Sequence, residues 1–118
     1  MSPASSAVRV GIAVVEHGGE YLVGVRGDDQ ALAGFAEFPG GKCHPDESFA
    51  DCAVREWLEE AGLKVTPERV LYETRHQYAH ALVELSFWLC RVAPATAAKP
   101  QRGFRWVPRE EMFALRFP

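Results

Sequence analysis

Residues 40–63 read GGKCHPDESFADCAVREWLEEAGL, a glycine-rich loop followed by an amphipathic segment. Within it, Glu56, Glu59 and Glu60 recur at steps of three and four residues, so a helix would place them on one face. Like charges at these spacings repel one another and weaken an isolated helix. A bound cation would remove that repulsion, and a solvated acidic surface is the alternative explanation.

The same stretch contains the signals that begin and end a helix. Ser48 predicts the N-cap, and Asp51, three residues later, is a weaker version of the acid in a capping box. Gly62 predicts the C-terminal end. The residues expected to form the buried stripe of this helix are Ala50, Ala53, Val54, Trp57 and Ala61.

Strand-forming segments flank the predicted helix on both sides. We expect strands over residues 8–15, 21–26, 35–38, 70–76, 81–92 and 104–107, a turn at 66–68, and a short helix from 108. Residues 81–92 are nearly continuously apolar, which predicts a central strand buried on both faces. The pattern indicates an α/β fold in which helices pack on one mixed sheet.

The bulk composition predicts one soluble globular domain over residues 1–118, with residues 1–6 as a flexible tail. The chain is 47% hydrophobic and 25% charged, and its net charge of −3 gives no basic surface for polymeric nucleic acid. Its three cysteines show no CxxC spacing, which argues against a disulfide framework and fits a reducing cytosol. No secretory signal or membrane-length apolar run is present, so we expect a cytoplasmic protein that does not contact membranes.

The residue types in the loop and helix suggest metal and phosphate chemistry. Carboxylate oxygens are the ligands that hard divalent cations prefer, and a backbone carbonyl at Gly40 or Gly41 would add another oxygen. Lys42 would meet phosphate charge. Arg55 would pair with Glu47 or with a neighbouring glutamate and hold the loop against the helix.

The spacing of these residues resembles the Nudix box. Gly41, five residues, Glu47, seven residues and then REWLEEAGL at 55–63 match that box at every defined position. The lead-in EFPGGK at 37–42 resembles MutT-like members of the family. The strand segment 78–89, and FRWVP at 104–108 followed by acidic residues, resemble them too. The resemblance therefore covers nearly the whole chain from Val8 onward.

This resemblance implies a Nudix-type α/β/α sandwich with a mixed sheet and hydrolysis that depends on Mg²⁺ or Mn²⁺. MutT-like enzymes cleave the diphosphate linkage of a (d)NTP and give the monophosphate and pyrophosphate. The implied metal ligands are Glu56, Glu59, Glu60 and the Gly40 carbonyl, with general base as the alternative role of Glu56. The implied catalytic residues are Glu56, Glu59 and Arg55. The implied structural residues of the motif are Gly41, Glu47 and Gly62.

The predicted substrate-binding residues are Arg26, Glu37, Phe38 and Lys42. The first three precede the glycine loop and would hold phosphate, hydrogen-bond a base edge and stack a base, although each taken singly is more often a core or rim residue. The implied partner is a small-molecule nucleotide, and the chain would be a monomer or a homodimer.

The sequence departs from the MutT-like pattern at more than one place, and two of the departures concern the loop and the metal site. His44 stands where an acid often follows the loop lysine, and we expect it to be an exposed loop residue. Residues 91–109 contain no acid, so the late metal-binding glutamate must come from elsewhere or be missing, with Glu84 as a candidate. A structural partner for Glu84 is the equally weighted alternative.

Two alternatives to a MutT-like hydrolase follow from the sequence. One is a Nudix-fold module that binds a nucleotide without turning it over, and the other is a pyrophosphatase of nucleotide sugars or ADP-ribose. The complete set of box glutamates favours a hydrolase over the binding module.

Overall fold

The apolar segments on both sides of the glycine loop assemble into one mixed sheet. The structure, a computed structural model, describes residues 7–25, 36–92 and 103–115. Its elements are β1 (Ala7–His17), β2 (Glu20–Val25), β3 (Ala36–Glu37), β4 (Gly40–Lys42), α1 (Phe49–Ala61), β5 (Val65–Gln77), β6 (Leu82–Val92), β7 (Phe104–Pro108) and the 3₁₀ helix η2 (Arg109–Ala114).

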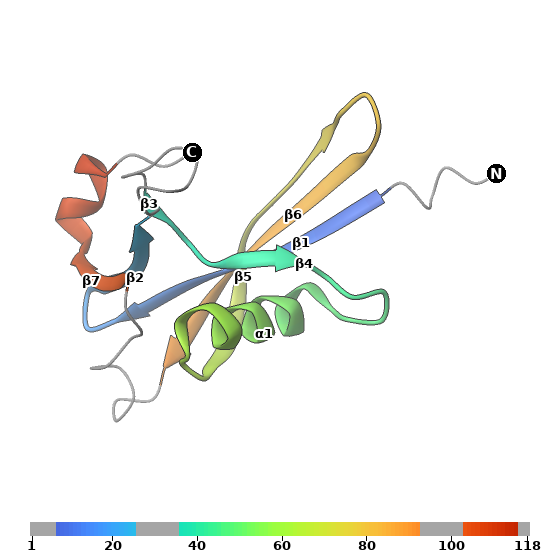
Figure 1. Cartoon of the computed structure of the whole chain (residues 1–118). Coiled ribbons are helices and arrows are strands. Elements are labelled where there is room, and N and C mark those ends of the chain that lie inside the picture. The colour runs from blue at the N-terminus through green and yellow to red at the C-terminus, as the bar shows by residue number, and fades with distance from the viewer. Residues whose placement is uncertain (1–6, 26–35, 93–102, 116–118) are drawn as a thin grey trace.

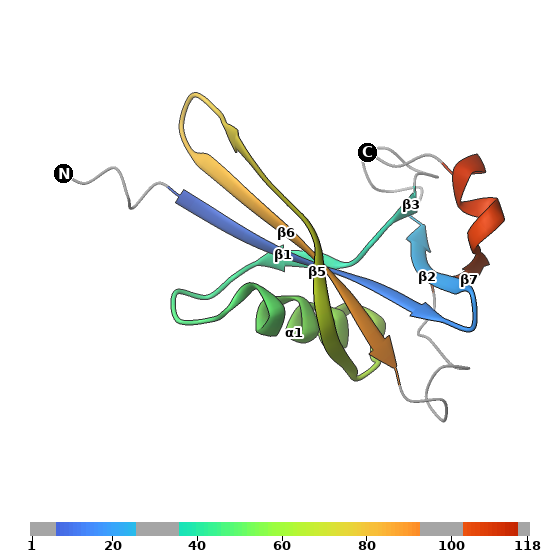
Figure 2. The same cartoon turned by 180° about the vertical axis from the view of Figure 1, so that it is seen from behind.

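Strand β1 connects the two halves of the seven-stranded sheet, whose main strand order is β3-β2-β1-β6-β5. It runs parallel to β6 on one side, and on the other it pairs antiparallel with β4 and, at its end, with β2. Strand β7 pairs with β2. As Figures 1 and 2 show, α1 lies along one face of β1 and β6, while β2, β3, β7 and η2 gather at one end of the molecule.

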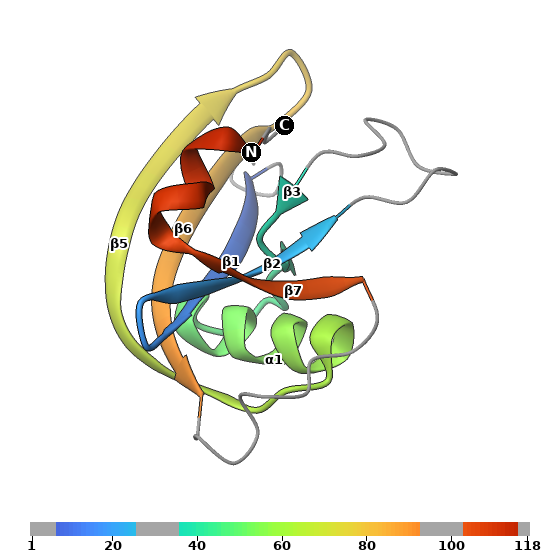
Figure 3. The same cartoon turned by 90° about the vertical axis from the view of Figure 1, so that its left-hand side faces the viewer.

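The helices lie on opposite sides of the β2–β7 pair. Leu22 of β2 belongs to the core cluster that contains Trp57 of α1, and Phe104 packs against the same cluster. The next residue along β2, Val23, points the other way into a smaller cluster that Met112 of η2 joins. Figure 3 shows the resulting layers, with α1 on one side of β2 and β7 and η2 (red) on the other. This layering agrees with the predicted sandwich.

Both predicted ends of the central helix are confirmed. The Ser48 hydroxyl accepts a hydrogen bond from the Asp51 amide at 3.0 Å, as an N-cap does. Gly62 adopts a left-handed conformation with φ of 73° and donates its amide to the Leu58 carbonyl at 3.0 Å. The buried positions of α1 are Cys52, Ala53, Trp57 and Ala61, so Cys52 was missing from the predicted stripe.

The predicted turn at 66–68 was wrong. Strand β5 runs without a break from Val65 to Gln77, with Pro67 opposite Cys90. The register shifts between Pro67 and Arg69, so an extra residue is absorbed as a bulge. Proline is tolerated here because β5 is an edge strand, where its missing amide costs no ladder hydrogen bond.

The central position predicted for residues 81–92 is confirmed, but their complete burial is not. Strand β6 lies between β1 and β5. Ser86, Leu89, Cys90 and Val92 are buried, whereas the first residues of the strand are only half-buried. Figures 1 and 2 show why: the β5–β6 hairpin extends beyond α1.

No helix among the described residues combines the length and the apolar character that a membrane span requires.

Strand β1 and helix α1 approach each other closely at Gly11. A Cβ atom there would lie 2.7 Å from the Phe49 carbonyl oxygen and 3.0 Å from Cys52 Sγ. We therefore expect Gly11→Ala to push α1 off the sheet and to lower the free energy of unfolding by about 1–3 kcal/mol. Urea denaturation followed by tryptophan fluorescence measures this, and an unchanged midpoint would show that the helix can shift without cost.

Candidate functional site

The glycine loop meets the helix at Gly41. In the β4–β1 ladder Gly41 lies opposite Gly11, and a Cβ atom on Gly41 would lie 2.4 Å from Cδ of Glu56. A Cβ atom there would push the Glu56 carboxylate, the end of a flexible side chain, out of its place, so glycine is what lets it rest on the backbone of β4. The first glycine of the box is therefore needed for close approach of a carboxylate.

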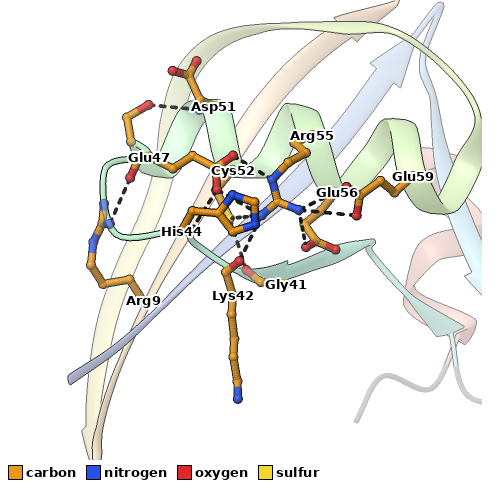
Figure 4. A network of polar contacts seen from close by, with 11 residues as sticks. Arg9, Gly41, Lys42, His44, Glu47, Asp51, Cys52, Arg55, Glu56 and Glu59 are labelled. Atoms are coloured by element: carbon orange, nitrogen blue, oxygen red, sulfur yellow. Dashed lines mark hydrogen bonds and ion pairs between the residues drawn. The ribbon is translucent and has the colours of Figure 1, made fainter. Parts of the chain in front are cut away.

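Arg55 joins the loop to the helix, as Figure 4 shows. Its Nε donates to Glu47 Oε2 at 2.7 Å and its Nη2 donates to Glu47 Oε1 at 2.9 Å, which makes a bidentate ion pair. The same Nη2 donates to the Lys42 carbonyl at 3.0 Å. The hydrogen bonds from Arg55 lower the pKa of Glu47 to about 2. The loop is thus fastened to α1 by one side chain.

The remaining nitrogen of Arg55 orients the helix carboxylates. Nη1 donates to Glu56 Oε2 at 2.9 Å and to both oxygens of Glu59 at 3.3 Å. These carboxylates, with Glu47 as the largest cause, raise the pKa of Arg55 above its ordinary value, so the guanidinium stays charged. Arg55 touches Glu47, Glu56 and Glu59 together, which makes it a positioning residue within this cluster.

The turn between β4 and α1 is held further by the His44 backbone and by Arg9. The His44 amide donates to Glu47 Oε1 at 3.0 Å, and the His44 carbonyl accepts from the Glu47 amide at 3.0 Å. The His44 side chain is exposed, as expected. Arg9 of β1 donates to the Glu47 carbonyl at 2.9 Å and lies 4.4 Å above the Phe49 ring. Arg9 therefore supports the loop from the sheet.

Glu60 stands beside Glu56 in a strongly acidic environment. Partial burial, a hydrogen bond with Glu56 and the charges of Glu56, Glu37 and Glu59 raise the pKa of Glu60 to about 8. Four carboxylates are thus close enough to repel one another, and Arg55 supplies a counter-charge to Glu56 and Glu59. A donor set made of carboxylate oxygens beside a glycine backbone is chemically suited to a hard divalent cation.

The side chains as placed do not form a closed metal site. Within residues 7–25, 36–92 and 103–115, no three His, Cys, Asp or Glu side chains converge in a metal-binding arrangement. Glu56 and Glu59 are instead drawn onto the Arg55 guanidinium. The assignment of Gly40, Glu56, Glu59 and Glu60 as metal ligands stays a prediction.

The predicted substrate-binding residues do not converge with the helix carboxylates as a group. The Lys42 side chain points away from α1 in Figure 4 and lines a recess of about 440 Å³ with Arg9 and His44. Phe38 packs against the smaller core cluster. Glu37, on β3, is near enough to Glu60 to raise its pKa. Arg26 lies outside the described residues.

Glu84 is placed away from the loop–helix site. It pairs with Arg75 at 3.7 Å and lines a recess of about 480 Å³ that Phe49 and Glu73 also border. None of the predicted metal ligands borders this recess. Among the described carboxylates outside the box, Glu37 adds its charge to the environment of Glu60, and the sequence interpretation had given it a role with the base instead.

Three contributors to the site were missed by sequence reasoning. Cys52 donates its thiol to the Gly41 carbonyl at 3.2 Å, Arg9 holds the loop, and Gly11 admits the helix. A glycine inside a strand pattern is a signal of close backbone approach, so Gly11 was detectable. Nothing in the local pattern around Arg9 or Cys52 identifies their partners.

The Glu47–Arg55 pair predicts a distinct response to acid. Glu47 has a pKa of about 2 in the folded chain against an ordinary value of 4.5, so its ionised form stabilises the fold above pH 4.5. That stabilisation is lost as the pH falls from 4.5 towards 2. We expect Glu47→Gln to be less stable than the parent chain near neutral pH, with a difference that shrinks across this window. Denaturant unfolding at stepped pH measures it, and a difference that stays constant down to the lowest pH would contradict the assignment.

Comparison with known proteins agrees with this geometry. A family model for the NUDIX domain matches residues 10–118. The CTP pyrophosphohydrolase of Escherichia coli (strain K12) is 30% identical over 112 residues, which cover 94% of this chain and 82% of that protein. The 8-oxo-dGTP diphosphatase of Proteus vulgaris is 38% identical over 58 residues, which cover 49% of this chain and 52% of that protein.

Solved structures share the fold of this chain. The solution structure of the E. coli ORF135 protein superimposes with a TM-score of 0.76 at 27% identity and covers 99% of this chain and 85% of that one. The MutT protein from Methanosarcina mazei Go1 gives a TM-score of 0.73 at 23% identity, covering 95% and 85%, and so supports the fold. With the complete box placed on its loop and helix, the family match over residues 10–118 shows that this chain belongs to the Nudix family and is a Nudix hydrolase of the MutT type.

Proposed function

We propose that this Nudix hydrolase cleaves a nucleoside triphosphate to the monophosphate and pyrophosphate, assisted by Mg²⁺ or Mn²⁺. The observation that carries the proposal is the arrangement around Arg55. One guanidinium holds Glu47 of the loop and Glu56 and Glu59 of the helix, while the Glu56 carboxylate rests on Gly41. This arrangement presents several carboxylates in fixed positions on α1 beside β4.

The residues that would hold the cation are Glu56, Glu59, Glu60 and the Gly40 carbonyl. A divalent cation bound there would neutralise charge on the phosphate oxygens and lower the pKa of water. Their chemistry fits this role because every donor is an oxygen and because the mutual repulsion that raises the pKa of Glu60 would be relieved by positive charge.

Glu56 and Arg55 would have different roles in the reaction. Glu56 is half-buried and fixed between Arg55 and Gly41, so it is suited to accept a proton from the attacking water. Arg55 would not touch the substrate. Its role would be to hold Glu56 and Glu59 in fixed positions relative to the loop. Fixed carboxylates need little reorganisation when charge moves during phosphoryl transfer.

The phosphates and base would be met by groups of the elements that lead into the loop. We assign Lys42, Glu37, Phe38 and Arg26 to this role. Lys42 is exposed and carries a positive charge next to the loop, and Glu37 lies on the short strand just before it. Glu37 also adds its charge to the Glu60 environment, so it would act near the reacting phosphates.

We place CTP first among the candidate substrates. The CTP pyrophosphohydrolase aligns over 82% of its length, whereas the 8-oxo-dGTP diphosphatase aligns over 52% of its length. Contacts that select a base come from several elements of a fold, so a match along most of the chain is the better guide to the substrate than a match to half of it.

A substrate panel tests this proposal. Purified chain would be incubated with CTP, dCTP, UTP, 8-oxo-dGTP, ADP-ribose and a nucleotide sugar, each with Mg²⁺ and with Mn²⁺, and the products separated by chromatography. We expect monophosphate and pyrophosphate from the triphosphates, with a cytosine nucleotide turned over fastest. If ADP-ribose or the nucleotide sugar is hydrolysed faster than every triphosphate, the proposed substrate class is wrong.

A further inference from the structure

Two cysteines that have no role in the proposed reaction, Cys43 after β4 and Cys52 of α1, lie close to each other. Cys43 follows β4, and its amide donates to the Arg9 carbonyl at 2.8 Å, which extends the β4–β1 ladder by one residue. Side chains alternate between the faces of a strand, so Cys43 shares its face with Gly41. Gly41 faces α1, because a Cβ atom there would meet Glu56.

Cys52 points back from α1 towards that same face. Its Sγ donates to the Gly41 carbonyl at 3.2 Å and lies 3.0 Å from the place a Cβ atom on Gly11 would occupy. Cys52 is completely buried, whereas Cys43 is half-buried. Burial raises the pKa of the Cys52 thiol to about 12, and a side-chain hydrogen bond with Cys43 contributes to the rise. Cys43 is therefore partly exposed, whereas Cys52, with which it shares a side-chain hydrogen bond, is not exposed.

We propose that Cys43 and Cys52 are an oxidation site at which a peroxide closes a reversible disulfide between the glycine loop and α1. The sulfur of Cys43 attacks one oxygen of hydrogen peroxide, the O–O bond breaks, and water leaves with a sulfenic acid formed on Cys43. The sulfur of Cys52 then attacks the Cys43 sulfur, the S–O bond breaks, and a second water leaves. Two thiols and one peroxide give one disulfide and two waters.

The geometry gives the two cysteines different roles. Cys43 is accessible to a small oxidant, and Cys52 has no exposed surface and can react only with a neighbouring sulfur. Cys90, the third cysteine, is buried on β6 and packs in the main core cluster with Ala13 and Val92. Cys90 is therefore the control that shows whether a buried thiol away from the loop is oxidised under the same conditions.

Closing the disulfide would change the support of Glu56. A disulfide sulfur carries no proton, so the hydrogen bond from Cys52 to the Gly41 carbonyl is lost. Gly41 is the backbone on which the Glu56 carboxylate rests, and Arg55 Nη2 is 4.0 Å from the Cys52 sulfur. We therefore expect the oxidised chain to hydrolyse its substrate severalfold more slowly, an effect that rests on the proposed function.

Peptide mapping tests disulfide formation independently of activity. Cleavage after Lys42 and Arg55 releases both cysteines on one tryptic peptide, residues 43–55. After treatment with hydrogen peroxide and alkylation of free thiols, we expect this peptide without alkyl groups and lighter by two hydrogen atoms. Dithiothreitol should restore two alkylation sites, and Cys90→Ser should behave as the parent chain does.

Single substitutions separate the disulfide from other oxidation. Cys43→Ser should leave Cys52 reduced, and Cys52→Ser should leave a sulfenic or sulfinic acid on Cys43. Over-oxidation of Cys43 in the parent chain with Cys52 still reduced, or a bridge between two chains, would overturn the proposal. A disulfide that forms without slowing turnover would overturn its effect on the site. A chain that turns over no nucleotide even when reduced would contradict the proposed function, and the peptide result would then decide the disulfide alone.

Discussion

Glu60→Gln should abolish nucleotide hydrolysis, with kcat/KM falling by about a hundredfold or more, and leave the fold intact. Partial burial, a hydrogen bond with Glu56 and the charges of Glu56, Glu37 and Glu59 raise the pKa of Glu60 to about 8. Its charge is therefore unfavourable for the chain alone and valuable only when a cation or a reacting group uses it. Glutamine keeps the shape and removes the charge, so stability should equal or exceed that of the parent chain.

The measurement pairs turnover with unfolding. Steady-state hydrolysis of CTP gives kcat/KM, and urea denaturation gives the free energy of unfolding. Asp51→Asn is the matched control, because it makes the same change in charge on an exposed position of the same helix. If Glu60→Gln has a turnover close to that of Asp51→Asn, Glu60 takes no part in the reaction.

Arg55→Lys should lower both activity and stability. Arg55 makes a bidentate pair with Glu47 and reaches Glu56 and Glu59 with its third nitrogen, and lysine presents one nitrogen where arginine presents three. We expect kcat to fall about 10–100-fold, as when groups that orient ligands are replaced. The lost charged hydrogen bonds should cost about 1–2 kcal/mol of the free energy of unfolding.

The double effect distinguishes Arg55 from a purely structural residue. If Arg55 positions the carboxylates, the parent chain should bind Mn²⁺ more tightly than Arg55→Lys under conditions in which both are folded, and KM for the nucleotide should change less than kcat. Arg75→Lys, in an exposed pair with Glu84 elsewhere on the sheet, is the control and should alter neither quantity. Loss of stability with unchanged kcat and Mn²⁺ binding would show that Arg55 only fastens the loop.

The helix and its glutamates were predictable because their signals are local. The Ser48 cap, the Gly62 stop and the apolar stripe all lie within one segment, and the structure shows both ends of the helix where the sequence places them. Arg55 was expected to pair with Glu47 or with a neighbouring glutamate, and it contacts Glu47, Glu56 and Glu59 together.

What the sequence did not reveal depends on contacts between distant segments. A turn was expected at 66–68 because Thr-Pro-Glu has turn propensity, but pairing with β6 imposes a bulged strand there. Arg9 contacts Glu47 across 38 positions, and no local pattern records that contact. The nearness of Glu37 to Glu60 likewise depends on how the fold places β3 relative to α1. Glu84, which the sequence suggested as the late metal-binding acid, is instead paired with Arg75.

The most direct test of the account is product release from CTP during a titration with Mg²⁺. We predict CMP and pyrophosphate in equal amounts, no product when a chelator removes divalent cations, and full recovery when Mg²⁺ is restored in excess. CDP with orthophosphate, product formation in the presence of the chelator, or tight binding of CTP by calorimetry without any product would contradict it.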